Sequence, residues 1–402
     1  MSEPREEKLL NGLKLLIWSD QSAPKVTAKL RIHNGAAFDP KDKMGVMALL
    51  GDILFPTEQA RQFFIEDLEG SLEVASNYDY IQITATAKSE EVLTLLETLA
   101  TAVTNPQITQ ENFIAVRDAR LKRILELEKN PIYVADRAVA KRLFGDFPYG
   151  RSAEGTPDSL AKIDRADLLF AKERFLTADN ATLAITGNVK SDYVYRAARR
   201  LFGTWTKADK KIPATFRPPE APDVRTLTIE LLNTDRFALR VAMNIAARSD
   251  KDFYAAQILT RMWQKQFCLN DEAHQGKSAY QPYLLRGFYT ISRNTLYGKE
   301  AESRPINTPG CQLLFQKSGK LVYPPIVQSD FETVKKAVLW DFQQKAAADL
   351  WLDVDTYKLV SVKDELSKLN GVTFADVQRV AENLRKQPSV SVVVKKPGDT
   401  KQ

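Results

Sequence analysis

Asp52 is the clearest candidate for chemistry in this chain. It lies in the apolar stretch Gly45 to Phe55, whose composition is typical of a short helix with one polar edge. A carboxylate can ligate a metal, but Ala48 and Gly51 on the same stretch offer neither a lone pair nor a titratable group. By itself the stretch supports neither a complete metal site nor a general base, and a core helix is the simpler interpretation.

Histidine and cysteine, the other usual metal ligands, are scarce. His33 and His274 lie 241 residues apart and no partner pattern surrounds either, so we expect surface or strand residues rather than ligands. Cys268 and Cys311 lack the spacing of a metal site and are too few for a disulfide scaffold. A single disulfide between these two cysteines stays open.

Composition bounds the class of protein. The chain has 402 residues, of which 44% are hydrophobic, so it can bury sizeable cores and is long for one domain. Lys and Arg number 57 and Asp and Glu 51, which gives a net charge of +6. The two signs are interspersed, and no basic stripe with interleaved aromatic residues is present. This pattern argues against nucleic acid as a partner.

The sequence contains no candidate membrane anchor. No apolar run reaches the roughly 18 residues that a membrane-spanning helix needs. The first residues, Met1 to Lys8, are charged and lack the apolar core of a signal peptide. We expect a soluble protein of unknown compartment, which would be periplasmic if a signal peptide has been removed.

Strand-like and helix-like segments alternate in the first half of the chain. Runs of apolar or alternating residues predict strands, and capped segments with helical spacing predict helices. Such an order predicts an α+β fold with helices packed on one face of a largely antiparallel sheet. The predicted strands are 13–18, 26–33, 81–87 and 181–186, and the predicted helices are 89–103, 110–129 and 131–143.

An internal repeat indicates that this unit is duplicated. Ala36-Ala37 before Lys41-Asp42 recurs as Ala246-Ala247 before Lys251-Asp252, a shift of 210 residues. Two further matches keep nearly this shift: Ile163-Asp164 with Val372-Thr373, and the strand around Ala184 with that around Val392. Matches at three separate places with one offset are typical of duplicated domains.

A proline-rich segment separates the two predicted domains. Residues 207–224 are rich in Lys, Pro and Ala and include four prolines, which favours an extended, semi-rigid linker. The predicted division is therefore an N-terminal domain of residues 1–206, the linker 207–224 and a C-terminal domain of residues 225–402.

Three blocks in the first half, in one order, resemble the pitrilysin/insulinase family of zinc peptidases (peptidase family M16). They are Phe147-Pro148-Tyr149-Gly150-Arg151, then 155–160 (Gly-Thr-Pro-Asp-Ser-Leu), then 175–189 from Phe175 to Val189. In that family they follow a helix with the inverted zinc motif H-x-x-E-H. The resemblance implies two homologous α+β domains of the LuxS/MPP-like metallohydrolase fold. Two such pairs close around an unfolded peptide, so this chain would form half of a shell.

The resemblance also implies that the catalytic residues are lost. The three positions of H-x-x-E-H correspond to Ala48, Gly51 and Asp52. The family's third zinc ligand, a glutamate on a later helix, falls on Lys122, or on Arg123 with a slip of one residue. A cation at that position would repel zinc. We therefore expect no catalytic residue and no bound metal at 48–52, although active relatives hold zinc.

Substrate-binding positions carry over only in part. The strand asparagine common near the family's site corresponds to Glu73. In the second half, Tyr280 matches the tyrosine that holds the scissile carbonyl in active shells, whereas the arginine position is Ala273. The glycine-rich loop of noncatalytic mitochondrial processing subunits, expected near 259–267, contains no glycine here. Glu73 and Tyr280 are therefore the predicted peptide-binding residues.

Three functions follow from the resemblance. The favoured one is a catalytically inactive homologue that binds unfolded peptide and pairs, as a homodimer or with an H-x-x-E-H-bearing subunit, within an active M16 peptidase. The alternative is a structural or scaffold subunit, as in respiratory complexes. The third, an active zinc metallopeptidase with displaced ligands, would need Glu126 or Glu128 after a register shift and is least favoured, because three protein ligands are usual.

Overall fold

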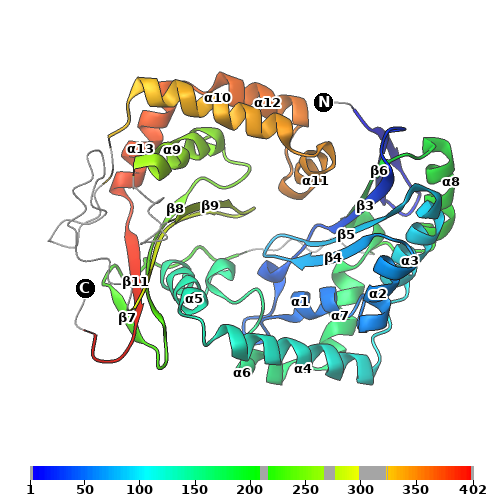
Figure 1. Ribbon diagram of the computed structural model, residues 1–402, viewed down its shortest axis with the longest axis horizontal. Helices are drawn as coiled ribbons and strands as arrows, with labels where there is room; N and C mark the ends of the chain where they lie inside the picture. Colours follow the sequence, from blue (N-terminus) through cyan, green and yellow to red (C-terminus); the bar gives the residue numbers. More distant parts are fainter. Residues whose placement is uncertain (1–2, 209–215, 267–276, 298–322, 324, 400–402) are drawn as a thin grey trace. The chain divides into compact units, whose positions relative to one another are not determined.

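The computed structural model describes the chain except for residues 1–2, 209–215, 267–276, 298–322, 324 and 400–402. Its internal contacts divide the chain into two compact units, each built around one β-sheet (Figure 1). Unit 1 consists of Met1–Leu125, Arg151–Arg217 and Ala346–Thr356, and unit 2 of Glu126–Gly150, Pro218–Lys345 and Tyr357–Gln402.

The sheet of unit 1 has the strand order β1-β2-β6-β3-β5-β4. β2 and β6 run parallel, whereas the other neighbouring pairs are antiparallel. The largely antiparallel sheet predicted from the sequence is therefore confirmed. The strands are β1 (Arg5–Lys8), β2 (Lys14–Ser19), β3 (Lys25–Ile32), β4 (Ser71–Ser76), β5 (Ile81–Lys88) and β6 (Ala181–Gly187).

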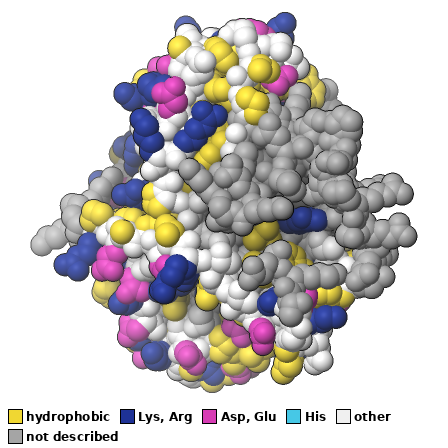
Figure 2. Space-filling model, turned by 90° about the vertical axis from the view of Figure 1, so that its left-hand side faces the viewer, with side chains coloured by type: hydrophobic (Ala, Val, Ile, Leu, Met, Phe, Trp, Pro, Cys, Tyr) yellow, Lys and Arg dark blue, Asp and Glu magenta, His cyan; other side chains and the backbone are white. Residues whose placement is uncertain are grey.

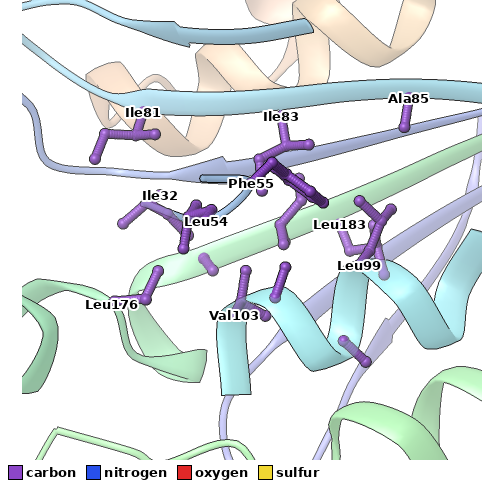
Figure 3. Packing of buried hydrophobic residues seen from close by; sticks show 14 of the residues in the cluster. Ile32, Leu54, Phe55, Ile81, Ile83, Ala85, Leu99, Val103, Leu176 and Leu183 are labelled. Carbon is purple, nitrogen blue, oxygen red and sulfur yellow. The ribbon is translucent and has the colours of Figure 1, made fainter. Parts of the chain in front are cut away.

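One face of this sheet packs on the main core of unit 1. Alternate residues of β3, among them Leu30 and Ile32, are fully buried, as the period of two along a strand requires. They pair with Ile83 and Ile81 of β5 and pack with helices that contribute to the same core (Figure 3). These helices are α1 (Val46–Asp52), α2 (Glu58–Glu66), α3 (Val92–Thr104), α4 (Gln110–Leu127), α6 (Pro157–Lys162), α7 (Arg165–Phe175) and α8 (Ser191–Phe202), with 3₁₀ turns at Ala36–Phe38, Ser89–Glu91 and Ala178–Asn180.

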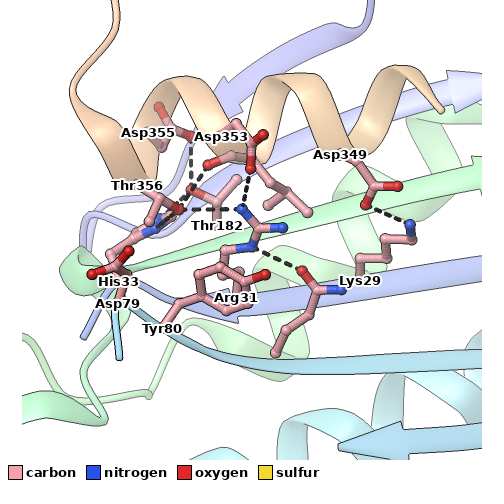
Figure 4. A network of polar contacts seen from close by, with 12 residues as sticks. Lys29, Arg31, His33, Asp79, Tyr80, Thr182, Asp349, Asp353, Asp355 and Thr356 are labelled. Atoms are coloured by element: carbon pink, nitrogen blue, oxygen red, sulfur yellow. Dashed lines mark hydrogen bonds and ion pairs between the residues drawn. The ribbon is translucent and has the colours of Figure 1, made fainter. Parts of the chain in front are cut away.

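The opposite face of the sheet carries α11 (Ala347–Tyr357), a helix from the second half of the chain (Figure 4). The alternation along β3 directs Lys29 and Arg31 to this face. Lys29 Nζ donates to Asp349 Oδ1 at 2.5 Å, and Arg31 Nη1 donates to Asp353 Oδ1 at 2.9 Å. These ion pairs lie beside an apolar cluster in which Leu16, Trp18 and Ala184 of the sheet pack with Ala348 and Leu352 of α11, and both hold the helix against the sheet.

Arg31 is the buried member of this set, with 3% of its surface exposed. Its Nε donates to Gln82 Oε1 at 2.8 Å, and its guanidinium lies 4.1 Å from the centre of the Tyr80 ring. A buried cation is tolerated where its donors are satisfied in this way. Arg31 thus joins two strands of the sheet to α11.

His33, just after β3, adds two hydrogen bonds to the same interface. Its Nδ1 lies 3.0 Å from Thr356 Oγ1, and its Nε2 lies 2.9 Å from Thr182 Oγ1. Both hydroxyls already donate elsewhere, Thr356 to the carbonyl of Leu352 and Thr182 to Asp355. His33 therefore links the end of β3 both to β6 and to α11.

The sheet of unit 2 repeats the topology of unit 1. Its order, β7-β11-β8-β10-β9, matches β2-β6-β3-β5-β4, and the parallel pair β7–β11 corresponds to the parallel pair β2–β6. The duplicated α+β fold is therefore confirmed. The strands are β7 (Leu227–Glu230), β8 (Arg236–Ile245), β9 (Lys277–Pro282), β10 (Gly287–Leu296) and β11 (Ser389–Lys395), and the helices are α5 (Pro131–Phe144), α9 (Phe253–Gln266), α10 (Gln328–Gln344), α12 (Val362–Gly371) and α13 (Phe374–Lys386), with a 3₁₀ turn at Pro148–Gly150.

In unit 2 the helix that comes from the other half of the chain is α5, which packs against β8 and β11. Arg240 of β8 is 2% exposed, and its Nε donates to Asp136 of α5. Its Nη1 donates to Asn294 Oδ1 of β10 at 2.9 Å. The two units therefore share one arrangement. In each, a buried arginine on a central strand binds an aspartate on the helix that the other half of the chain contributes.

The two compact units therefore differ from a simple division of the chain in sequence order. Residues 126–150 lie in unit 2 and residues 346–356 in unit 1, so each half contributes a helix to the unit formed mainly by the other. The limits 1–206 and 225–402 and the linker 207–224 come from the sequence repeat and stay predictions. Of that linker, the described residues 216–224 form neither helix nor strand.

The predicted elements of the first half are confirmed within a few residues of their ends. The stretch 259–267, expected as a loop, is instead helical through Gln266, because Leu259, Met262 and Trp263 are buried at helical spacing in α9. Ala273, His274, Cys268 and Cys311 lie outside the described residues.

The surface agrees with the interspersed charges of the sequence. On the face drawn in Figure 2, Lys and Arg side chains lie among Asp and Glu side chains. Within the described part of the chain, no helix is both long and apolar enough to cross a membrane.

We expect Asp353→Asn to lower the free energy of unfolding by about 3 kcal/mol, because it leaves a buried guanidinium without its carboxylate. Asp349→Asn on the same helix is the matched control. The side chain of Asp349 is 37% exposed and that of its partner Lys29 is 17% exposed. Because this ion pair is partly in water, we expect Asp349→Asn to lower the free energy of unfolding by no more than about 1 kcal/mol. Urea denaturation measures both, and equal losses would contradict the role given to Arg31.

Limited proteolysis should cut first within 207–224 and give fragments near half-size, since exposed segments without secondary structure are preferred sites. The fragments should stay together in native buffer and separate in denaturant, because each unit contains segments from both sides of the cut. Early cleavage inside α4, or fragments that separate without denaturant, would count against this organisation.

Candidate functional site

The site is built around α1, whose start is fixed by Asp39. The carboxylate of Asp39 accepts hydrogen bonds from the backbone N–H groups of Gly45 at 2.7 Å and Met47 at 2.9 Å. These amides would otherwise be unpaired at the helix N-terminus. Gly45 has a φ of 100°, which favours glycine, and an added Cβ would lie 3.0 Å from the Cα of Gly155. Burial raises the pKa of Asp39 to about 7.

Asp52, at the end of α1, is paired with Arg120 of α4. Arg120 Nε lies 2.8 Å and Nη2 2.7 Å from Asp52 Oδ2, a two-nitrogen contact to one carboxylate oxygen. Burial raises the pKa of Asp52, and the charge and hydrogen bond of Arg120 oppose that rise. Asp52, the one carboxylate among positions 48, 51 and 52, is therefore already bound by the guanidinium of Arg120.

Arg120 also contacts two other acceptors at the site. Its Nη1 lies 2.6 Å from Glu154 Oε2, and its Nη2 donates to the carbonyl of Ala48 at 3.4 Å. The Arg120 side chain is 6% exposed, while those of Asp52 and Glu154 are 28% and 29% exposed. The guanidinium therefore fills the space between α1, α4 and the segment before α6.

Gly51 faces the sheet, where space is closed. A Cβ at this position would lie 2.6 Å from Ser76 Oγ and near side chains of Ile81 and Val74. A contact below 3.0 Å requires a neighbour to move. A longer side chain at position 51 would therefore need the Ser76 hydroxyl to turn away.

The residues present do not fit the zinc ion of active relatives. Ala48 and Gly51 supply no donor atom, and Asp52 is held by Arg120. Among the residues that the structure describes, no group of three or more His, Cys, Asp or Glu could hold a metal ion.

Only part of the predicted site comes together. Ala48, Gly51 and Asp52 share α1, but Lys122 is exposed on α4, and the residue that α4 places against Asp52 is Arg120. Arg123, the alternative to Lys122, is exposed and lies 3.6 Å from Glu154 Oε2. This distance indicates a weak surface ion pair.

The predicted peptide-binding residues belong to different units. Glu73 is exposed on β4, at the edge of the unit 1 sheet. Tyr280 lies on β9 of unit 2, where its hydroxyl donates to the carbonyl of Ala246 at 2.7 Å and burial raises its pKa. Their roles as binding residues stay predictions.

Arg120 was missed from the sequence although a signal for it exists. It continues the buried series Phe113, Val116 and Ile124 on α4, at a spacing of three and four residues. A cation on an otherwise apolar helix face must find acceptors nearby. That rule identifies an unusual residue but not its partners, which come from distant segments.

Comparison with protein-family models gives two matches. The model described as Insulinase (Peptidase family M16) matches residues 14–157, and the model described as Peptidase M16 inactive domain matches residues 162–269. Together the matched segments cover more than half of the chain.

Curated relatives and a solved structure agree with these matches. The chain is 25% identical over 275 residues to the probable mitochondrial-processing peptidase subunit beta of Arabidopsis thaliana, covering 65% of this chain and 51% of that protein. It is 23% identical over 219 residues to cytochrome b-c1 complex subunit 1 of Homo sapiens, covering 52% and 45%. The chain thus spans about half the length of these relatives. The structure of a peptidase M16 inactive domain from Pseudomonas fluorescens matches with a TM-score of 0.80 at 17% identity, covering 100% of this chain and 99% of that one.

We expect the purified chain to bind no stoichiometric zinc, because α1 lacks donors at two positions and its carboxylate is paired. Elemental analysis after dialysis against a zinc-containing buffer and then a zinc-free buffer measures this. One tightly held zinc ion per chain would contradict the assignment of Ala48, Gly51 and Asp52 as a degenerate motif.

Proposed function

Because the chain belongs to the insulinase family, peptidase family M16, we propose that it is a noncatalytic subunit that binds unfolded peptide beside an active chain carrying H-x-x-E-H. The observation that supports the noncatalytic role is the Arg120 guanidinium, which contacts Asp52 on the helix that bears the zinc motif in active relatives. The match to a family model described as an inactive domain supports the same role.

The edge of the unit 1 sheet supports peptide binding. β4 is the last strand of the sheet, and among the described strands it pairs only with β5. An unpaired strand edge presents backbone donors and acceptors, to which an extended peptide can add as another strand. Glu73 is exposed on this strand and would lie beside such a peptide.

Pairing with a second chain is supported by the relatives. Both curated relatives are named as subunits, one of a processing peptidase and one of the cytochrome b-c1 complex. The second name also favours the alternative of a scaffold subunit, which would need no peptide-binding edge. Peptide binding therefore separates the two proposals.

The test of peptide binding uses an unstructured, fluorescently labelled peptide and its backbone N-methylated copy. Anisotropy should detect binding of the first, with affinity for the second lower by about tenfold or more, since several backbone hydrogen bonds of about 1 kcal/mol each are lost. Glu73→Lys should weaken binding of a basic peptide, whereas Glu58→Lys, an exposed change on α2, should not. Absence of binding to either peptide would favour the scaffold alternative.

The test of partnership mixes this chain with an M16 chain that carries H-x-x-E-H. Peptide cleavage by the mixture should exceed that of the partner alone, while this chain alone should show none. An unchanged rate together with a stable complex would indicate a structural role, and rapid cleavage by this chain alone would contradict the noncatalytic assignment.

A further inference from the structure

The outer side of α8 presents a row of arginines to solvent. The inner side of this helix is buried in the core of unit 1 through Val194, Ala197, Ala198 and Phe202. Arg196, Arg199 and Arg200 are exposed on the opposite side, at the spacing of three and four residues that places side chains together on a helix. Arg200 Nη2 lies 3.3 Å from Glu97 Oε1 of α3, and within the described part of the chain no ion pair is recorded for Arg196 or Arg199.

The nearest carboxylate on the same helix is bound by another cation. Asp192 lies one turn before Arg196, and its Oδ1 accepts a hydrogen bond from Arg5 Nη1 of β1 at 2.5 Å. The guanidinium of Arg199 lies 5.8 Å from the centre of the Tyr195 ring. An aromatic ring does not neutralise a guanidinium, so Arg196 and Arg199 keep their positive charge at the surface.

A fully exposed leucine lies beside this helix. Leu10, in the turn between β1 and β2, has its side chain in solvent. The next residue, Asn11, donates from Nδ2 to the carbonyl of Phe202 at 2.7 Å and to that of Trp205 at 3.1 Å. These bonds tie the turn that carries Leu10 to the C-terminal end of α8.

The composition of this surface favours a lipid partner over a protein partner. Stable protein interfaces have an apolar centre that is depleted of charge, whereas the centre of this helix face is Arg196. Basic residues beside a protruding leucine suit an anionic membrane, where cations contact phosphates and the leucine enters the acyl boundary. Tyr193, three residues before Arg196 and 41% exposed, is of the type enriched at membrane–water interfaces.

We propose that the outer side of α8 and Leu10, together the α8 surface, bind peripherally to membranes that contain anionic lipid. Arg196, Arg199 and Arg200 would contact the lipid phosphates, and Leu10 would insert its side chain. Three cations and one leucine give a weak, reversible contact that salt screens. The inference does not depend on peptide binding or on a partner chain, so its failure would leave the proposed function untouched.

The test is cosedimentation of the full chain with vesicles of phosphatidylcholine, with and without phosphatidylglycerol. At low salt the chain should bind the vesicles that contain phosphatidylglycerol and leave the others in solution. High salt should release it, because the attraction is screened. Absence of binding to the anionic vesicles at low salt, or equal binding to both kinds, would overturn the proposal.

Arg196→Gln combined with Arg199→Gln should weaken binding by about 25-fold, since each cation near an anionic surface contributes about fivefold. The matched control is Arg385→Gln combined with Lys386→Gln, which removes two exposed cations from α13 and should bind like the wild type. All four side chains are exposed, so both variants should keep the wild-type melting temperature. Equal weakening by the two pairs would mean that net charge, and not the α8 surface, drives binding.

Leu10→Ser should weaken binding by about tenfold or more, because several methylene groups no longer enter the bilayer. Leu232→Ser, a change at an exposed leucine of unit 2, is its control and should have no effect. Binding that depends on the arginines but not on Leu10 would overturn insertion of this residue. Binding of duplex DNA through the same arginines, without binding to either kind of vesicle, would overturn the choice of a lipid partner.

Discussion

A guanidinium taken out of water must be paired, and this requirement shapes the molecule at the three arginines described above and at Arg248, which is 7% exposed and binds Glu365. Arg31, Arg120 and Arg240 are each less than a tenth exposed, and each binds a carboxylate from a segment distant in sequence. Within a domain, apolar packing is non-directional and tolerates exchange of similar side chains. A buried ion pair does not tolerate such exchange, because the two charged groups must lie at hydrogen-bonding distance and in the right orientation. The three arginines therefore specify which segments meet, while the apolar core supplies most of the stability.

On α1 the same requirement places the carboxylate of Asp52 in an ion pair with Arg120. An active relative keeps a metal at its motif and a water to activate, which demands open coordination and exposed reactive groups. Here Asp52 is bound by Arg120, and a Cβ at Gly51 would lie 2.6 Å from Ser76 Oγ. Asp52 therefore joins α1 to α4 through Arg120.

The sequence predicted the fold better than it predicted the site, for physical reasons. The alternation in β3 and β5 and the helical spacing of α3 are local periods, and the duplication repeats them with one offset, so element types and strand patterns could be inferred. Period two also indicates that Lys29 and Arg31 share a face, but it does not indicate that a helix from residue 347 onward covers it. The partners of Arg120 were hidden for the same reason, since they lie 34 and 68 residues away along the chain.

The exchange of α5 and α11 bears on how the chain is made. Ribosomes release a chain from its N-terminus, and domains built from contiguous sequence can fold as they emerge. Here the sheet of unit 1 is complete in sequence by Gly187, yet the helix that neutralises Lys29 and Arg31 is synthesised only after residue 346. During that interval one face of the sheet carries uncompensated cations in water. The same face carries Leu16, Trp18 and Ala184, which pack with Ala348 and Leu352 of α11. Until that helix is made, the nascent unit therefore lacks both the carboxylates and the apolar cover of this face.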